Sequence, residues 1–576
     1  MFVGPIFIRE ALILPRQFKH FLIRSGYVAA LIVLMFTASQ AAFGWQQVRN
    51  IGDVARFGSL IFQVFSLVQL SLVIFFALLF SAGNVAQEKD RQTLILLLMT
   101  DLRDREMVLG KLFSSLLLVV VLLAASIPVF IFVQLMGGVS TKQIGWSLAI
   151  CASSALAAGS WGSLVAYWRD KTFQTLAISV LGVVLFFGVV EAVIHFTGAS
   201  VIATWMAVLN PYRAMIGILD PLHEVTHSVA VNVSAQDTAI AMIMLFVVLN
   251  GYAIFRLRVW NPSRATFLTA AARKDDGTST AKAISRNIWH NPVIWREICT
   301  RAYGRKIFVI KLAYFSLAAF AVTYFQHSRE MSELVLGMIS PVGLAFVGLA
   351  LLSLILVNAQ AVTALTTERD GKTLDLLLAT DVTAKEFVYG KLGGVFYNTK
   401  ELILIPLVLL VYYVFAGVIG GENCVYVVIS FLILVVFCTM LGLHSGLSFD
   451  SSRSAIANSL GTMFFLFIGI FIFMMLLIEA RSSFFLQFQS FIVFIGAGSI
   501  ALYTSLTHKN PSGALTISAG VLPFLTFYAI TQFLLEGTLG VCLAIAVAYG
   551  FTTLAMLVPA VSEFDVALGR TTLDKG

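Results

Sequence analysis

Long apolar segments alternate with short polar ones along the whole chain. Segments such as 116–133 and 455–478 carry no charge and are close to or above the ~20 residues that a helix needs to cross a bilayer. Six spans are expected in the first half, near 27–43, 60–82, 112–136, 144–167, 174–196 and 238–255. Six more are expected near 307–325, 336–357, 392–418, 425–447, 455–478 and 537–558. The pattern predicts an all-α polytopic membrane protein.

Two further apolar stretches lie in the second half, at about 484–506 and 514–535, and have no counterpart in the first half. They fit either a re-entrant pair or two additional spans. An added pair leaves the sidedness of the later segments unchanged. The expected count is therefore 12 spans, or 14 if both stretches cross the membrane.

Composition agrees with this class of protein. Hydrophobic residues make up 59% of the chain and charged residues 12%, against roughly 45–50% and 25% in globular proteins. This balance excludes a soluble enzyme, a disordered chain and a disulfide scaffold. The 5 cysteines are scattered, without the spacing of a metal or redox site.

Basic residues set the expected topology. With the N-terminus inside, the inside segments up to residue 306 hold 22 Lys and Arg, and the outside loops hold 4. Cytoplasmic loops are enriched in these residues, so both termini are expected in the cytoplasm. The net charge of +8 is explained by these loops, and no nucleic-acid partner is expected. The polar, basic stretch 261–290 predicts a cytoplasmic linker between a first half, 1–260, and a second half, 291–576.

The two halves repeat a polar loop at a distance of 280 residues. The segments 88–112 and 368–392 are identical at 14 of 25 positions. Weaker echoes pair Arg9-Glu10 with Arg296-Glu297, and Lys171-Thr172 with Arg453-Ser454. Because each half has six spans, the second half enters the membrane from the same side as the first. This predicts two parallel repeats about a pseudo-two-fold axis along the membrane normal.

Each repeated loop combines a charged cluster with an apolar stripe. Leu94, Leu97 and Leu98 recur at helical spacing, as do their counterparts in the second loop. A single loop of this kind is best explained as a helix packed under its own bundle. Two near-copies at equivalent cytoplasmic positions favour a docking surface for a two-fold partner.

These loops resemble a signature of the membrane subunits of type-2 ATP-binding-cassette (ABC) exporters, which runs close to Glu-Arg-Glu-x-Gly-Thr-Leu-Glu-x-Leu-Leu-x-Thr-Pro and ends in Gly-Lys. The chain departs from this signature at three places. Gln92 and Lys372 replace its Gly, Ile95 and Asp375 replace the Glu that follows its Thr-Leu, and Asp101 and Asp381 replace its Pro. The coupling-loop residues that the resemblance indicates are Glu88, Lys89, Asp90, Thr93, Leu94, Leu97, Thr100, Asp101, Gly110, Lys111, Glu368, Arg369, Asp370, Thr373, Leu374, Leu377, Thr380, Asp381, Gly390 and Lys391.

The resemblance implies two permease halves fused in one chain, in a bacterial inner membrane. ABC ATP-binding subunits, as two copies or a heteropair, would dock on the two loops at the cytoplasmic face and would hold the ATP and Mg²⁺. The chain itself is expected to bind no cofactor and to be no enzyme, since Gly371-Lys372-Thr373 lacks the upstream glycine of a phosphate-binding loop and has Thr366 there. The sequence does not indicate the transported substrate.

Two other functions are open. His223-Glu224-x-x-His227 matches a zinc motif, which suggests a membrane-bound metalloprotease or a metal-binding site, with Asp237, His195 or Glu191 as a third ligand. A solvated loop helix without metal is the default there. An ion-driven secondary transporter would carry ionisable groups near the bilayer midplane. The central parts of the spans hold almost none, although Glu191 and His195, near the outer end of the fifth span, either face a translocation path or reach out to the interface.

Overall fold

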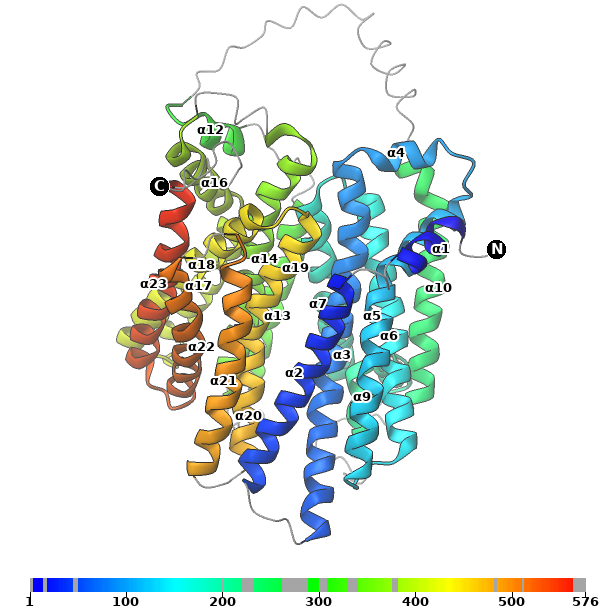
Figure 1. Cartoon of the computed structure of the whole chain (residues 1–576), viewed down its shortest axis with the longest axis vertical. Coiled ribbons are helices and arrows are strands. Elements are labelled where there is room, and N and C mark those ends of the chain that lie inside the picture. Colours follow the sequence, from blue (N-terminus) through cyan, green and yellow to red (C-terminus); the bar gives the residue numbers. More distant parts are fainter. Residues whose placement is uncertain are drawn as a thin grey trace, which may run out of the picture. The chain divides into compact units, whose positions relative to one another are not determined.

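The computed structural model of the chain is helical, with turns between its helices, throughout the residues that it describes (Figure 1). Described residues are 4–13, 18–44, 50–198, 200–219, 233–261, 289–299, 308–328, 340–374, 382–480, 484–509 and 512–562. Among them, 13 helices are long and apolar enough to cross a membrane, or up to 15 if two bent helix pairs each form one span. The all-helical, multi-span class predicted from the sequence is confirmed.

The chain divides into two compact units. Unit 1 comprises residues 1–281 together with 480–491, and unit 2 comprises residues 282–479 together with 492–576. The helices of unit 1 are α1 (Gly4–Ile13), α2 (Phe18–Phe43), α3 (Ile51–Asp90), α4 (Thr93–Leu98), α5 (Asp104–Leu135), α6 (Thr141–Trp168), α7 (Thr172–Thr197), α8 (Val201–Val208), α9 (Pro211–Leu219) and α10 (Ala235–Trp260).

Unit 2 has a similar order of helices with two additions near its end. Its helices are α12 (Pro292–Cys299), α13 (Phe308–Ser328), α14 (Pro341–Asp370), α16 (Ala384–Asn398), α17 (Lys400–Phe415), α18 (Gly421–Ser448), α19 (Ser452–Met463), the π-helical turn η3 (Phe464–Gly469), α20 (Ile470–Ala480), α22 (Gly513–Leu534) and α23 (Thr538–Ser562). Helix α21 (Phe484–Leu506) begins in the segment grouped with unit 1 and continues into unit 2.

The extra apolar stretches of the second half form α21 and α22, and each is long and apolar enough to cross a membrane by itself. This favours two further spans over a re-entrant pair. In unit 1 the helices that follow α7 are a pair of short ones, α8 and α9. Helices α8 and α9 meet at an angle of 88°. The sequence analysis did not predict this pair, because each helix is too short to stand out as a span.

Helix boundaries follow the 280-residue spacing of the sequence repeat. Helices α3 and α14 end at Asp90 and Asp370, and α6 and α18 cover 141–168 and 421–448. Close helix contacts repeat as well. A Cβ on Gly162 would lie 2.7 Å from the carbonyl oxygen of Leu78, and a Cβ on Gly442 would lie 2.8 Å from that of Asn358. The absence of a side chain at both glycines lets α6 approach α3, and α18 approach α14, backbone to backbone.

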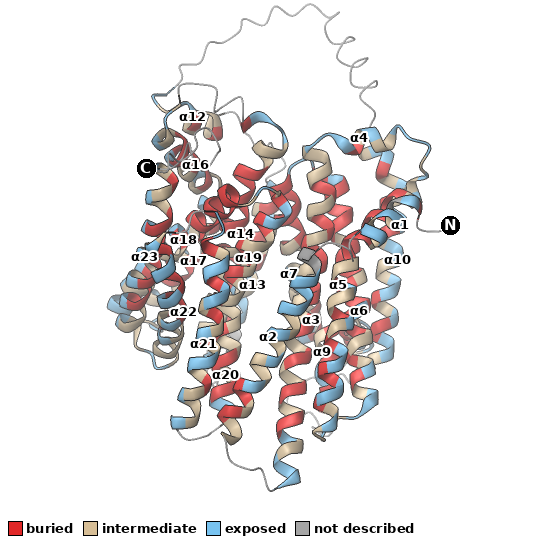
Figure 2. Ribbon diagram, viewed as in Figure 1, coloured by how far each residue is buried: buried red, intermediate tan, exposed pale blue. Residues whose placement is uncertain are grey.

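Many positions on the helices of each unit are exposed, pale blue in Figure 2, and a large number of them carry large apolar side chains. Leu135 is 80% exposed, Phe255 78% and Phe415 87%. A monomeric soluble protein rarely exposes large contiguous apolar areas to water. In a bilayer these side chains face lipid tails, which are as apolar as leucine. The surface therefore agrees with the span lengths in indicating an integral membrane protein.

Candidate functional site

The first repeated loop begins where α3 ends. Gln92 adopts a left-handed backbone with φ of 59°, which turns the chain from α3 into α4. The Thr93 hydroxyl donates to the carbonyl oxygen of Glu88 at 3.3 Å. Lys372 has φ of 55° at the equivalent place, and Thr373 donates to the carbonyl oxygen of Glu368 at 3.1 Å. A left-handed residue explains why the resembled signature has glycine here, since other residues pay roughly 1–2 kcal/mol for this conformation.

Glu88 ties the end of α3 to α5. The Nζ atom of Lys111 donates to a carboxylate oxygen of Glu88, and the two side chains are only 8% and 19% exposed. Lys111 lies about two turns inside α5, immediately after Gly110. The Gly-Lys that closes the sequence repeat therefore supplies the cation for the glutamate that opens it.

The next two residues contact the ends of two other helices. Lys89 donates through Nζ to the carbonyl oxygens of Tyr167 at 2.5 Å and Arg169 at 2.9 Å, at the C-terminus of α6. Asp90 accepts a hydrogen bond from the Thr172 hydroxyl at the N-terminus of α7. The last carbonyls of a helix have no partner within the helix and favour a cation, whereas the N-terminus favours an anion. Each of the three charges thus contacts a group of complementary charge or polarity: Glu88 contacts a lysine, Lys89 the C-terminal carbonyls of α6, and Asp90 the N-terminus of α7.

The second loop repeats this arrangement with partners 280 residues later. Lys391 donates to Glu368 at 2.6 Å. Arg369 donates to the carbonyl oxygen of Gly446 at 2.6 Å, and to that of Phe449, at the C-terminus of α18.

The last charge of the second triplet also finds its equivalent partner. Asp370 accepts from the Ser452 hydroxyl at 2.5 Å, at the start of α19. The structural equivalent of Thr172 is Ser452, two residues before the Ser454 with which the sequence comparison paired it. We call the contacts made by Glu88, Lys89 and Asp90, and by Glu368, Arg369 and Asp370, the two loop anchors.

The anchor of unit 2 contains an additional ion pair. Glu297 on α12 accepts from Lys391 at 2.7 Å, and Arg296 contacts both Glu297 and Glu368. Lys391 is 1% exposed and Glu297 6%. Burial by itself raises the pKa of Glu297, but Lys391 and then Arg296 outweigh it, and the pKa lies below its ordinary value. In unit 1 the equivalent Glu10 pairs with Arg9 at 2.8 Å near the surface.

Gly394 accounts for this difference between the units. A Cβ on Gly394 would lie 2.7 Å from the Cβ of Glu297, so only glycine at 394 lets α12 lie this close to α16. The equivalent positions to Gly393 and Gly394 in unit 1 are Phe113 and Ser114. There the Phe113 ring meets Phe7 of α1 edge to face, at 6.3 Å between centroids. Gly390 also lets α12 approach α16 closely, because its Cβ would lie 2.7 Å from that of Val293, but its equivalent in unit 1, Gly110, is a glycine as well.

The leucine stripe of the first loop faces its own unit. Leu94 is 1% exposed and packs with residues of α3, α5, α6 and α10, and Leu97 and Leu98 lie partly buried against the same cluster. Leu374 is 4% exposed in the equivalent place. The outer face of the first loop instead presents Leu96, at 64% exposed, and Met99, at 60%. The stripe therefore closes the fold, and the residues between the stripe positions are the ones open to a partner.

The remaining loop residues lie around this face. Thr100 and Asp101 are exposed, and the Thr100 hydroxyl donates to the carbonyl oxygen of Leu97 at 2.6 Å. Leu377, Thr380 and Asp381 of the second loop lie outside the described residues. The first loop is therefore the one whose outer face is seen in full.

The two ionisable residues near the end of α7 have separate surroundings. Glu191 accepts from Asn210 at 2.7 Å and from Arg213 at 2.6 and 2.7 Å, which ties α7 to the start of α9. His195 is exposed, and its ring meets Phe196 edge to face. Glu191 thus has a structural role in joining the short helix pair to α7.

His223, Glu224 and His227 lie outside the described residues. Within the part of the chain that is described, no group of three or more His, Cys, Asp or Glu side chains is arranged to hold a metal ion.

Several anchor residues were not predicted from the sequence. Thr172 and Ser452 were detectable, because they lie in the same 280-residue register as the loops. Glu297 was indicated only by the Arg-Glu echo, and its pairing with Lys391 was not predicted. The helix ends held by Lys89 and Arg369 had no local signal, since the partner atoms are backbone oxygens.

Comparison with known proteins gives no further assignment. No protein-family model, curated protein or solved structure matches this chain. Fold and site together define a helical membrane protein with two matched charged loops. The function must be argued from the contacts of those loops.

Proposed function

We propose that this chain is the membrane-spanning subunit of an ATP-driven ABC transporter, an exporter, with two permease halves fused in one polypeptide. Separate ABC ATP-binding subunits, as two copies or a heteropair, dock on the two loops at the cytoplasmic face. They bind and hydrolyse ATP with Mg²⁺, while this chain forms the path for a substrate that crosses the membrane.

The observation that carries the proposal is the repetition of the loop anchor. Six charged residues in two loops contact equivalent atoms in the two units, at a constant spacing of 280 residues. Apolar helices can pack against one another in a membrane without three consecutive charged residues. A loop that must transmit force does benefit from it, because each anchor joins the ends of four consecutive spans.

The mechanical consequence follows from the first anchor. Glu88 holds α5, Lys89 holds the end of α6 and Asp90 holds the start of α7. A partner that pushes on α4 therefore moves four helix ends together instead of bending one loop. Closure of two ATPase subunits around ATP supplies such a push at two equivalent places, and its reversal after hydrolysis resets the path.

The docking face allows a sharp test that leaves the anchors intact. Leu96 and Met99 are exposed and make no part of the anchor, so Leu96→Ser with Met99→Ser is expected to leave the chain folded. Burying each side chain against a partner contributes roughly 1.5–3 kcal/mol. Loss of both is then expected to weaken ATPase binding at least about 100-fold.

The experiment is purification of the tagged chain from its native membrane, with measurement of the ABC ATP-binding subunit that accompanies it and of ATP hydrolysis. The wild-type chain is expected to bring the subunit and the activity, and the Leu96/Met99 double variant to lose both. A matched control is Leu135→Ser with Phe415→Ser, which removes exposed apolar side chains far from the loops. Absence of any ATP-binding subunit from the wild-type preparation would overturn the proposal, as would ATP binding by the isolated chain.

A further inference from the structure

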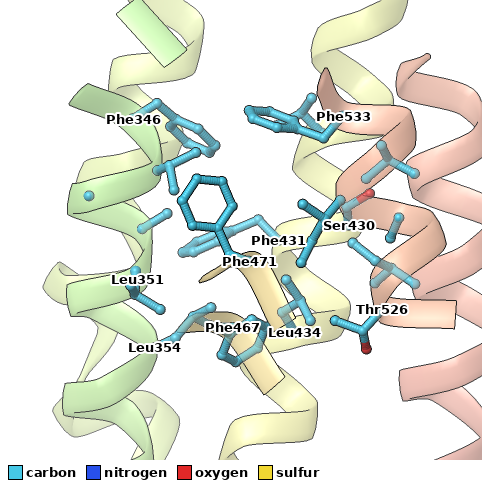
Figure 3. Close-up of a pocket in the computed structure, with 18 of the residues that line it drawn as sticks. Phe346, Leu351, Leu354, Ser430, Phe431, Leu434, Phe467, Phe471, Thr526 and Phe533 are labelled. Atoms are coloured by element: carbon cyan, nitrogen blue, oxygen red, sulfur yellow. The ribbon is translucent and has the colours of Figure 1, made fainter. Parts of the chain in front are cut away.

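Unit 2 contains a cavity of about 400 Å³ between α14, α18, the η3–α20 segment, α22 and α23 (Figure 3). Aromatic and branched aliphatic side chains form most of its wall. Those labelled in the figure are Phe346, Leu351, Leu354, Phe431, Leu434, Phe467, Phe471 and Phe533. All of the lining residues belong to unit 2, and none belongs to the loop anchor.

The polar groups of the wall are already occupied. Ser430 donates to the carbonyl oxygen of Tyr426 at 2.8 Å, and Thr526 to that of Leu522 at 2.6 Å. The hydroxyls of Thr526 and Tyr549 are 2.8 Å apart and share a hydrogen bond. With these protons engaged, the wall has no free donor for a polar ligand. A buried water needs two to four polar partners, so the cavity is not suited to hold ordered water.

Its length and volume indicate the shape of an occupant. The lining residues of α14 run from Leu344 to Leu354, ten residues or about 15 Å along the helix. A dry apolar cavity of about 150 Å³ accepts one benzene molecule, so 400 Å³ accommodates roughly sixteen carbon atoms. An apolar space of this capacity matches a segment of a single hydrocarbon chain.

The surroundings identify the source of such a chain. Helices α14, α18, α22 and α23 each qualify as membrane spans, and outward residues such as Val547 and Val558 of α23 are 61% exposed. The medium around this unit is therefore lipid. The cavity lies beside the first halves of α14 and α18 and the second half of α22, at the opposite end of α14 from Glu368.

We propose that this cavity binds the hydrocarbon chain of a membrane lipid. The site has no equivalent built from the same helices in unit 1, because α22 belongs to the additional pair of unit 2. It stands independently of the transporter assignment, since it rests on the wall chemistry, the volume and the membrane location. The headgroup is not selected by the cavity, which recognises the apolar chain alone.

Gly348 supplies a variant that adds a side chain at the cavity wall without a clash. It lines the cavity, and no heavy atom lies within 4 Å of the Cβ that a side chain would add. Gly348→Leu places an isobutyl group in open space and also favours the helix, because glycine is a poor helix former. Gly496→Leu on α21 is the matched control. It too has open space around its Cβ, but it does not line the cavity.

The test is photo-crosslinking of the purified full-length chain in lipid nanodiscs, followed by mapping of the labelled peptides. One arm uses a long-chain fatty acid with a photoactivatable group near the chain end, and the other uses phosphatidylcholine with the same group on one acyl chain. Labelling of Phe346, Phe467 or Phe471 is expected with at least one probe. It is expected to fall at least about fivefold in Gly348→Leu and to stay unchanged in Gly496→Leu.

Labelling by the fatty acid alone assigns the site to a free chain, and labelling by both probes assigns it to phospholipid as well. Either result supports the proposal. Labelling confined to outward residues such as Val547 and Val558, or labelling of the cavity that persists in Gly348→Leu, overturns it. If Gly348→Leu does not fold, Ala529→Phe on α22 blocks the opposite wall and is tested in the same way, with the same expected loss.

Discussion

The cluster around Lys391 permits a quantitative test of how the two loop anchors differ. Lys391→Met keeps most of the volume of the side chain and removes its charge. It leaves the carboxylates of Glu297 and Glu368, which are 6% and 14% exposed, with Arg296 as the one other basic side chain that contacts them among the described residues. Removing one partner from a buried ion pair typically costs 3–5 kcal/mol, because a charge is left without compensation. We expect a loss of about 4 kcal/mol in the free energy of unfolding of unit 2.

The corresponding change in unit 1 should cost less. Lys111 pairs with the single carboxylate of Glu88, and that carboxylate is 19% exposed and reaches solvent more easily. Losing one hydrogen bond to a charged group costs about 1.5–3 kcal/mol. Lys111→Met is therefore the matched comparison, and its effect is expected to be about half that of Lys391→Met.

Buried cysteines allow each unit to be followed separately. Cys151 in unit 1 is 1% exposed and Cys438 in unit 2 is 0% exposed. In a chain that keeps only one of the five cysteines, reaction with a thiol-specific fluorophore during heating reports unfolding around that residue. A change of 1 kcal/mol shifts the midpoint by roughly 2–4 °C in a unit of this size. Lys391→Met should thus lower the Cys438 midpoint by about 8–16 °C.

A compensating variant separates the charge effect from a packing effect. Adding Glu297→Gln and Glu368→Gln to Lys391→Met removes the uncompensated carboxylates, and Arg296, at 33% exposed, can reach solvent. Replacing a whole buried charge cluster by neutral groups costs far less than breaking it. The triple variant should recover at least half of the decrease in the Cys438 midpoint temperature. A Lys391→Met shift no larger than that of Lys111→Met, or no recovery in the triple variant, would refute the reasoning.

Two further predictions use the same reporters. Gly442→Ala is expected to destabilise unit 2 by about 1–3 kcal/mol, since the new Cβ meets backbone of α14, and Gly162→Ala should do the same in unit 1 against α3. Equal midpoints for the variants and the wild type would show that these helices do not need the close approach. Because the folded-state pKa of Glu297 is depressed, its contribution is present above its ordinary value of 4.5 and is lost as pH falls through the folded pKa. Glu297→Gln should therefore lower the Cys438 midpoint at neutral pH, with the difference disappearing in acid; a difference that grows in acid would contradict this sign.

The sequence by itself determined the class of protein and most of its spans. Transfer of a side chain from water to lipid depends mainly on that side chain, so a run such as 455–478 signals a span without knowledge of its neighbours. The repeated loops were equally visible, because a 280-residue register needs only comparison of the chain with itself. The short pair α8–α9 was not visible, since neither helix has the length of a span.

Only the tertiary structure decided which atoms the loop residues contact. Leucines at positions such as 94 and 97 have the same spacing whether they face a partner or their own helices, and packing turns Leu94 inward. Lys89 finds backbone oxygens 78 and 80 residues away, and no side-chain pattern records such a partner. The need for glycine at 394 becomes visible only when α12 packs on α16. The absence of a Cβ there lets Glu297 come within hydrogen-bonding distance of Lys391. Contacts of this kind depend on how helices meet in three dimensions, and the local sequence does not contain that information.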